Sequence, residues 1–105
     1  MENSRTIEIL RLMQNELGFS KDFKFVGICD TIFALKTQKK VTTEEVSFIL
    51  DLLRDNKPNG NNKYSKYTKG YFWIDRLFWW DTIDEEPKTK QVRTDFINDL
   101  ISNIK

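Results

Sequence analysis

The sequence predicts an all-α protein, a small four-helix domain with a long aromatic-rich insertion between the third and fourth helices. Three observations support this fold class. Four stretches of the chain carry apolar residues at helical spacing. Glycine and proline are scarce, at four and two of 105 residues, while 31% of the residues are charged, a composition typical of helical rather than disordered proteins. The strongest loop signal, Asn-Lys-Pro-Asn-Gly-Asn-Asn at 56–62, follows the third stretch.

The first helix is expected over residues 4–17. Ser4 can cap its start, and Gly18 can end it, because glycine readily takes the backbone conformation that follows a helix. Its apolar face is spaced by three or four residues and comprises Ile7, Leu10, Met13 or Gln14, and Leu17.

The second helix is expected over residues 23–38. Gly27 inside it would cost about 1 kcal/mol relative to alanine, which close packing against a neighbouring helix would offset. Cys29 and Phe33 belong to a wide apolar face. Since Cys29 has no histidine or other base to activate it, a buried structural thiol is expected rather than a nucleophile.

The third and fourth helices are expected over residues 43–55 and 88–103. Thr42 and Glu45 form a capping box ahead of the third helix, and Phe48 widens its apolar stripe. In the fourth helix, apolar residues recur every three or four positions: Val92, Phe96, Ile97, Leu100, Ile101 and Ile104. The whole chain, 1–105, fits a single domain with one modest core.

The insertion, 56–87, contains the densest group of large side chains in the chain. Lysines and tyrosines alternate over 63–69, and all three tryptophans fall within 70–80. This spacing fits neither a strand nor a single helical face. Two interpretations stay open: the aromatic residues form part of the core, or they form an interaction surface, as exposed aromatic patches often do.

The composition argues against several function classes. The chain has no histidine and one cysteine, and it carries no phosphate-binding glycine loop or catalytic motif, so we expect neither an enzyme nor a bound cofactor or metal. A formal net charge of +1 disfavours nucleic-acid binding. No apolar run approaches a membrane span, and no signal-peptide pattern opens the sequence, so we expect a cytoplasmic protein.

A binding protein that self-associates is therefore expected, with two readings of what it binds. In the first, a small nucleotide-like ligand stacks on aromatic residues while basic residues contact its phosphates. In the second, the tryptophans act as hot spots on a partner protein. The candidate ligand-binding residues are Tyr64, Lys66, Tyr67, Lys69, Tyr71, Trp73, Arg76, Trp79, Trp80 and Arg93. For Arg93, a surface salt bridge is the simpler alternative.

The order of several short motifs also resembles a known group of proteins. Gly27-Ile-Cys29 is followed by Val41-Thr42-x-x-Glu45, by Phe78-Trp-Trp80, and by Pro87 before a closing helix that contains Arg93. This order is similar to that of small, largely uncharacterised proteins of bacteriophages and prophages, which carry Gly-Leu-Cys, Ile-Thr-x-x-Glu and Trp-Trp. Those proteins have adjacent proline and arginine where this chain separates Pro87 from Arg93.

The resemblance implies a role in the host cytoplasm. Small phage proteins without catalytic residues often bind a host defence protein or sequester a nucleotide signal on which defence depends. By resemblance, this chain is expected to counter host defence by sequestering a small nucleotide-like signal. The alternative is direct inhibition of a host defence protein through the tryptophan-rich surface.

Overall fold

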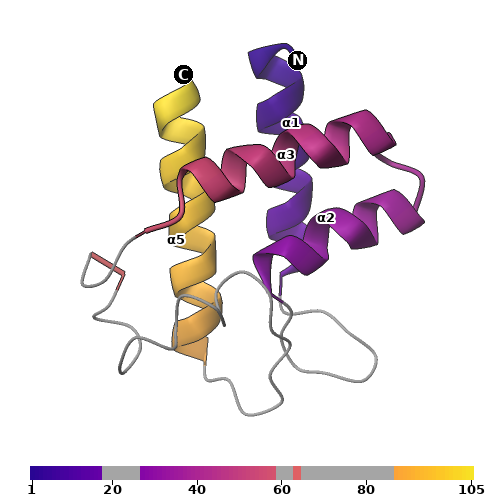
Figure 1. Cartoon of the computed structure of the whole chain (residues 1–105). Helices are drawn as coiled ribbons and strands as arrows, with labels where there is room; N and C mark the ends of the chain where they lie inside the picture. The colour runs from indigo at the N-terminus through magenta and orange to yellow at the C-terminus, as the bar shows by residue number, and fades with distance from the viewer. Residues whose placement is uncertain (18–26, 59–62, 65–86) are drawn as a thin grey trace.

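The computed structural model describes residues 1–17, 27–58, 63–64 and 87–105, with only the backbone described at 87–90. These residues form four α-helices and no strand, which confirms the all-α class for this part of the chain. The helices are α1 (Asn3–Glu16), α2 (Ile28–Thr37), α3 (Thr43–Asp55) and α5 (Pro87–Ile104) (Figure 1). Most of the predicted insertion lies outside the described residues.

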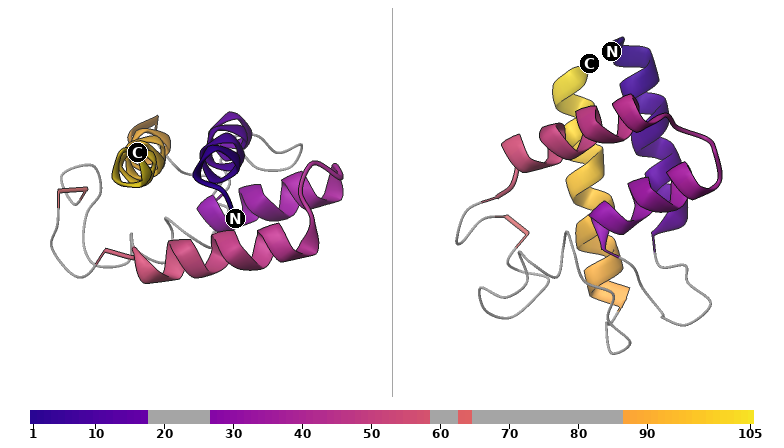
Figure 2. Two further views of the ribbon diagram at one scale, coloured as in Figure 1. Left: turned by 90° about the horizontal axis from the view of Figure 1, so that it is seen from above. Right: turned by 45° about the vertical axis from the view of Figure 1, so that its right-hand side comes forward.

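The helices form two layers. Figure 2 shows α1 and α5 side by side, with α2 and α3 running across them, and α1 contacts both α2 and α5 while α2 contacts α3. Polar side chains join α1 to α5 along their length: Gln14 Nε2 donates hydrogen bonds to Asn98 Oδ1 at 2.8 Å and to the Thr94 carbonyl at 3.2 Å. Arg11 Nη1 donates to the same Asn98 oxygen at 2.9 Å. The first and last described helices are therefore direct neighbours.

One hydrophobic core lies between these layers, because each helix turns its apolar stripe inward. The fully buried side chains include Ile9, Leu10, Met13 and Leu17 of the α1 region, Ile28, Ile32 and Leu35 of α2, Ile49 of α3, and Val92 and Ile97 of α5. Cys29 is also buried, at 3% exposure, as predicted.

Two predicted core aromatics lie outside the core. Phe33 of α2 is 45% exposed and Phe48 of α3 is 40% exposed. Successive residues of a helix are about 100° apart, so Phe33 is rotated well away from the arc on which Ile32 and Leu35 are buried. The apolar faces predicted for these two helices are therefore too wide, because they include Phe33 and Phe48.

The starts of α1 and α2 correct two predictions. The N-cap of α1 is Glu2, which makes no side-chain capping bond, and Ser4 lies inside the helix. Gly27 is the N-cap of α2 and not an interior residue. Its N–H donates to Asp30 Oδ2 at 3.1 Å, and the Asp30 N–H donates to the Gly27 carbonyl at 3.1 Å. The expected cost of an interior glycine therefore does not arise.

The capping box at the start of α3 is confirmed. The Glu45 N–H donates to Thr42 Oγ1 at 3.1 Å, and the Thr42 N–H donates to Glu45 Oε1 at 2.9 Å. These two bonds satisfy backbone donors that the first turn of a helix leaves without an intrahelical acceptor.

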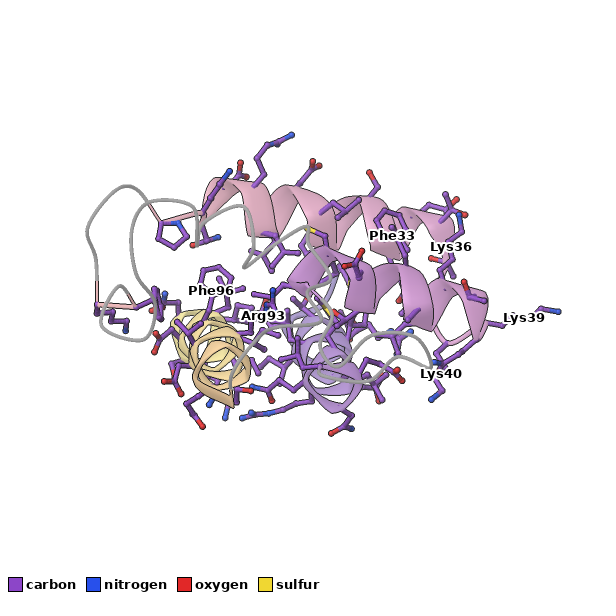
Figure 3. All side chains as sticks on the ribbon, turned by 90° about the horizontal axis from the view of Figure 1, so that it is seen from below. Phe33, Lys36, Lys39, Lys40, Arg93 and Phe96 are labelled. Atoms are coloured by element: carbon purple, nitrogen blue, oxygen red, sulfur yellow. The ribbon has the colours of Figure 1, made fainter. Side chains whose placement is uncertain are left out.

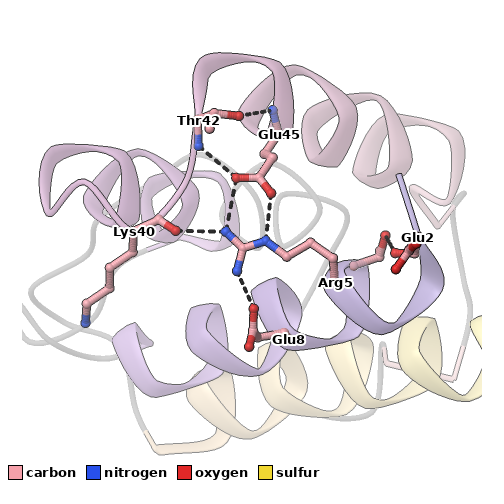
Figure 4. Close-up of polar contacts among 7 residues, drawn as sticks. Glu2, Arg5, Glu8, Lys40, Thr42 and Glu45 are labelled. Atoms are coloured by element: carbon pink, nitrogen blue, oxygen red, sulfur yellow. Dashed lines mark hydrogen bonds and ion pairs between the residues drawn. The ribbon is translucent and has the colours of Figure 1, made fainter.

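Arg5 of α1 connects this capping box to the first helix (Figure 4). Its Nε donates to Glu45 Oε2 at 2.7 Å and its Nη2 to Glu45 Oε1 at 3.0 Å. The same Nη2 donates to the Lys40 carbonyl at 2.9 Å, and Nη1 pairs with Glu8. We call Arg5, Glu8, Thr42 and Glu45, with the Lys40 carbonyl, the Arg5 cluster. Hydrogen bonds from Arg5 are the main cause that lowers the pKa of Glu45 to about 2.

The turn between α2 and α3 places Lys39 in the left-handed region, at φ 60°. The Lys40 N–H donates to the Leu35 carbonyl at 3.0 Å and the Lys39 N–H to the Lys36 carbonyl at 2.9 Å. This bonding pattern is the Schellman motif, in which glycine is the favoured residue at the left-handed position.

Replacing Lys39 by glycine is expected to raise the free energy of unfolding by about 0.5–1 kcal/mol, because glycine lacks the Cβ that makes this conformation costly. Urea denaturation followed by circular dichroism measures the change. Lys36→Gly, three residues earlier and inside α2, is the matched control and should destabilise by up to about 1 kcal/mol. A loss of stability in Lys39→Gly would contradict the left-handed assignment.

Candidate functional site

Two of the predicted ligand-binding residues, Tyr64 and Arg93, lie in the part of the chain that the structure describes. Arg93 is part of α5, and Tyr64 packs against this helix. The remaining candidates lie outside the described residues: Lys66, Tyr67, Lys69, Tyr71, Trp73, Arg76, Trp79 and Trp80.

Arg93 is buried, with 1% of its surface exposed. The alternative of a salt bridge at the surface is therefore wrong, because Arg93 does not lie at the surface. Figure 3 shows Arg93 and Phe96 on the side of α5 that faces α2 and α3. The sequence contained a signal for this position, because Arg93 precedes Ile97 by four residues and so continues the buried stripe of α5.

Tyr64 packs on the same helix. It is 8% exposed, and its ring meets the Phe96 ring edge-on, with 5.8 Å between the centroids and 68° between the planes. Its hydroxyl donates a hydrogen bond to Asp99 Oδ2. Phe96 and Asp99 are three residues apart on α5 and thus on adjoining turns of one face. The sequence pattern indicated Tyr64 as a candidate site residue, but it did not indicate Phe96 or Asp99 as its partners.

Lys63 completes the contact. Its Nζ lies 2.6 Å from Asp99 Oδ2 and 5.4 Å from the centre of the Tyr64 ring. Burial acts to raise the pKa of Asp99, but the hydrogen bonds from Lys63 and Tyr64 outweigh burial, so this pKa lies below its ordinary value. Burial, and then the Asp99 hydrogen bond, raises the pKa of the Tyr64 phenol. Asp99 is therefore held as a carboxylate and Tyr64 as a neutral hydrogen-bond donor.

The end of α2 carries a second group of exposed side chains. Phe33, Lys36, Lys39 and Lys40 extend from this end of the molecule (Figure 3). The Arg5 cluster adjoins them, and its two carboxylates and one guanidinium leave it with a net negative charge. The lysines also lie at the carbonyl end of a helix, where a positive side chain complements the helix dipole. Local balance of charge therefore explains these lysines without a ligand.

Cys29 offers little reactivity. Burial is the main cause that raises the pKa of its thiol to about 12, and thiolate is the form that attacks substrates or binds metals. Among the described residues, no three histidine, cysteine, aspartate or glutamate side chains are grouped so that they could hold a metal ion. None of the described helices combines the length and apolar character needed to cross a bilayer.

The structure thus brings together a small group of residues on α5, which we call the α5 site: Arg93, Phe96 and Asp99, with Lys63 and Tyr64 packed against them. It combines a buried guanidinium, two aromatic rings and a carboxylate that is already engaged by a lysine and a phenol. Comparison of the chain with protein-family models, with curated proteins and with solved structures found no match.

Proposed function

We propose that this chain is a phage-type, non-enzymatic binding protein that counters host defence by sequestering a small nucleotide-like signal in the cytoplasm. The phage origin and the role against defence derive from the motif resemblance. The ligand class derives from the combination of aromatic and basic residues in the chain. The observation that carries the proposal is the burial of Arg93 on α5, three residues before Phe96, against which Tyr64 packs.

A buried guanidinium is well suited to an anionic ligand. Removing a charge from water is costly, so a buried arginine is retained where acceptors surround it. Its five N–H donors exceed what one carboxylate accepts in a bidentate pair. A phosphate that entered this buried position could bind the Arg93 guanidinium bidentately.

The positions of Tyr64 and Pro87 along the chain support a ligand site at α5. Tyr64 lies against Phe96, and α5 begins at Pro87, nine residues before Phe96. At 1.5 Å per residue this is about 14 Å along the helix. In the sequence, the predicted ligand-binding residues between Lys66 and Trp80 lie between Tyr64 and Pro87, which are both described at α5.

Arg93→Lys is expected to weaken nucleotide binding at least about tenfold, because lysine keeps the charge but cannot form the bidentate contact. Native mass spectrometry with a panel of cyclic and linear nucleotides identifies a bound mass and its stoichiometry, including any self-association. Titration calorimetry then compares the variant with the wild type. Arg54→Lys, on the exposed surface of α3, is the matched control and should bind like the wild type.

Circular dichroism and a thermal melt establish that Arg93→Lys is folded before binding is compared. A wild-type protein that carries no nucleotide after purification and binds none in the panel would contradict the sequestering role. Equal affinity in Arg93→Lys and the wild type would exclude Arg93 from the site. Inhibition of a host protein through the tryptophan-rich stretch would then be the reading to pursue.

A further inference from the structure

Lys63 and Tyr64 are held at α5 by more than one contact. The Tyr64 hydroxyl and the Lys63 ammonium both engage one carboxylate oxygen of Asp99, and the Tyr64 ring packs edge-on against Phe96. A hydrogen bond to a charged acceptor is strong and directional, and the ring contact fixes a second point. Together they set the position and the orientation of Tyr64 on the helix.

We infer that Asp99 and Phe96 anchor Lys63 and Tyr64 to α5, so that Tyr64 is a positioning residue rather than a residue that contacts the ligand. The residue is 8% exposed, its ring already meets Phe96, and its hydroxyl is already bound to Asp99. Little of Tyr64 is left for a ligand to stack on. This differs from the role that the sequence predicted for Tyr64, and it adds Asp99 as a residue on which the site depends.

The anchor has a consequence for the residues that follow it in the sequence. Residues 65–86 join Tyr64 to the first residue of α5, Pro87. With Tyr64 held against Phe96, both described residues that flank this segment lie at α5, because Pro87 is its first residue and Tyr64 packs on it. Without the anchor, only the Pro87 flank would be fixed there, while the preceding described residues lie at the end of α3, near Asn56. The anchor therefore fixes the positions of the two described residues between which this stretch lies in the sequence, Tyr64 and Pro87.

The distribution of tryptophan provides a direct test. All three tryptophans of the chain are at 73, 79 and 80, so tryptophan emission reports on that stretch and not on the described helices. Far-ultraviolet circular dichroism mainly reports on the helices. In Asp99→Ala and in Tyr64→Ala, we expect the accessibility of tryptophan to acrylamide to rise about twofold, as local opening requires, with the helical signal retained.

Asn103→Ala is the matched control, because Asn103 lies one turn after Asp99 on α5 and its side chain is exposed. Its quenching should match the wild type. Tyr64→Phe retains the ring and removes only the hydroxyl, so its quenching should lie between those of the wild type and Tyr64→Ala. Unchanged quenching in both Asp99→Ala and Tyr64→Ala would overturn the anchor.

The effect of the anchor on ligand affinity rests on the proposed function and has a separate readout. For a nucleotide that the wild type binds, Asp99→Ala should weaken binding about tenfold, although Asp99 does not contact the ligand. Increased quenching with unchanged affinity would overturn the positioning role. Absence of nucleotide binding in the wild type would contradict the proposed function, and the quenching comparison would still decide whether the anchor exists.

Discussion

Replacing Ile97 by alanine is expected to lower the free energy of unfolding by about 2–5 kcal/mol, the largest stability effect considered for this chain. Ile97 is fully buried on α5 and belongs to the same core as Ile9 and Leu10 of α1. The substitution removes three side-chain carbons and leaves a cavity that close-packed neighbours fill only in part. For a domain whose total stability is about 5–15 kcal/mol, this is a large fraction.

Urea denaturation monitored by circular dichroism at 222 nm measures this loss. Ile104→Ala is the matched control, because Ile104 is the same residue type on the same helix but only partly buried. Its cost should be about 1 kcal/mol, in proportion to the smaller area removed from water. Equal losses in the two variants would mean that the buried face of α5 has been assigned incorrectly.

Replacing Glu45 by alanine is expected to lower the free energy of unfolding by about 2–3 kcal/mol, because it removes half of a capping box and the acceptor of two Arg5 hydrogen bonds together. The Glu45 side chain is 18% exposed and that of Arg5 31%, so the pair is partly shielded from solvent. Glu44→Ala, one residue earlier in the same first turn, is the matched control and should cost less than about 0.5 kcal/mol.

The contribution of Glu45 to the free energy of unfolding should also depend on pH. Its pKa falls from the ordinary 4.5 to about 2 in the folded protein. A group with a lowered folded-state pKa stabilises the protein fully above its unfolded pKa, and this stabilisation disappears as the group is protonated. The loss should therefore develop between about pH 4.5 and pH 2. In Glu45→Gln, which cannot titrate, stability should fall less steeply over this range. An identical acid dependence in the wild type and Glu45→Gln would contradict the assignment.

The sequence predicted those features of the helices well that depend on residues close together in the chain. The capping box of Thr42 and Glu45 depends on residues three apart, and α3 begins immediately after Thr42. The apolar spacing of the closing helix likewise gave its buried face, including Val92 and Ile97. In both cases the physical cause acts within one or two helical turns, so neighbouring residues contain the necessary information.

Features that depend on distant residues were not predictable in this way. Arg5 and Glu45 are 40 residues apart, and no short pattern relates them. The burial of Arg93 differs, because its spacing from Ile97 is a local signal, and the alternative of a surface salt bridge did not use it. Tyr64 was assigned to a ligand because of its lysine and tyrosine neighbours, whereas its contacts depend on Asp99, 35 residues away.

The pairing of α1 with α5 bears on how fast the protein folds. Helical domains usually fold quickly because most of their contacts are between residues close in sequence. Here Arg11 binds Asn98 across 87 residues and Gln14 binds the Thr94 carbonyl across 80. The apolar face of α1 that packs on α5 cannot be covered until α5 has been synthesised, since α5 follows every other described helix. These long-range contacts are expected to slow folding relative to a helical domain with local contacts alone, and the side of α1 that packs on α5 stays uncovered while the chain is incomplete.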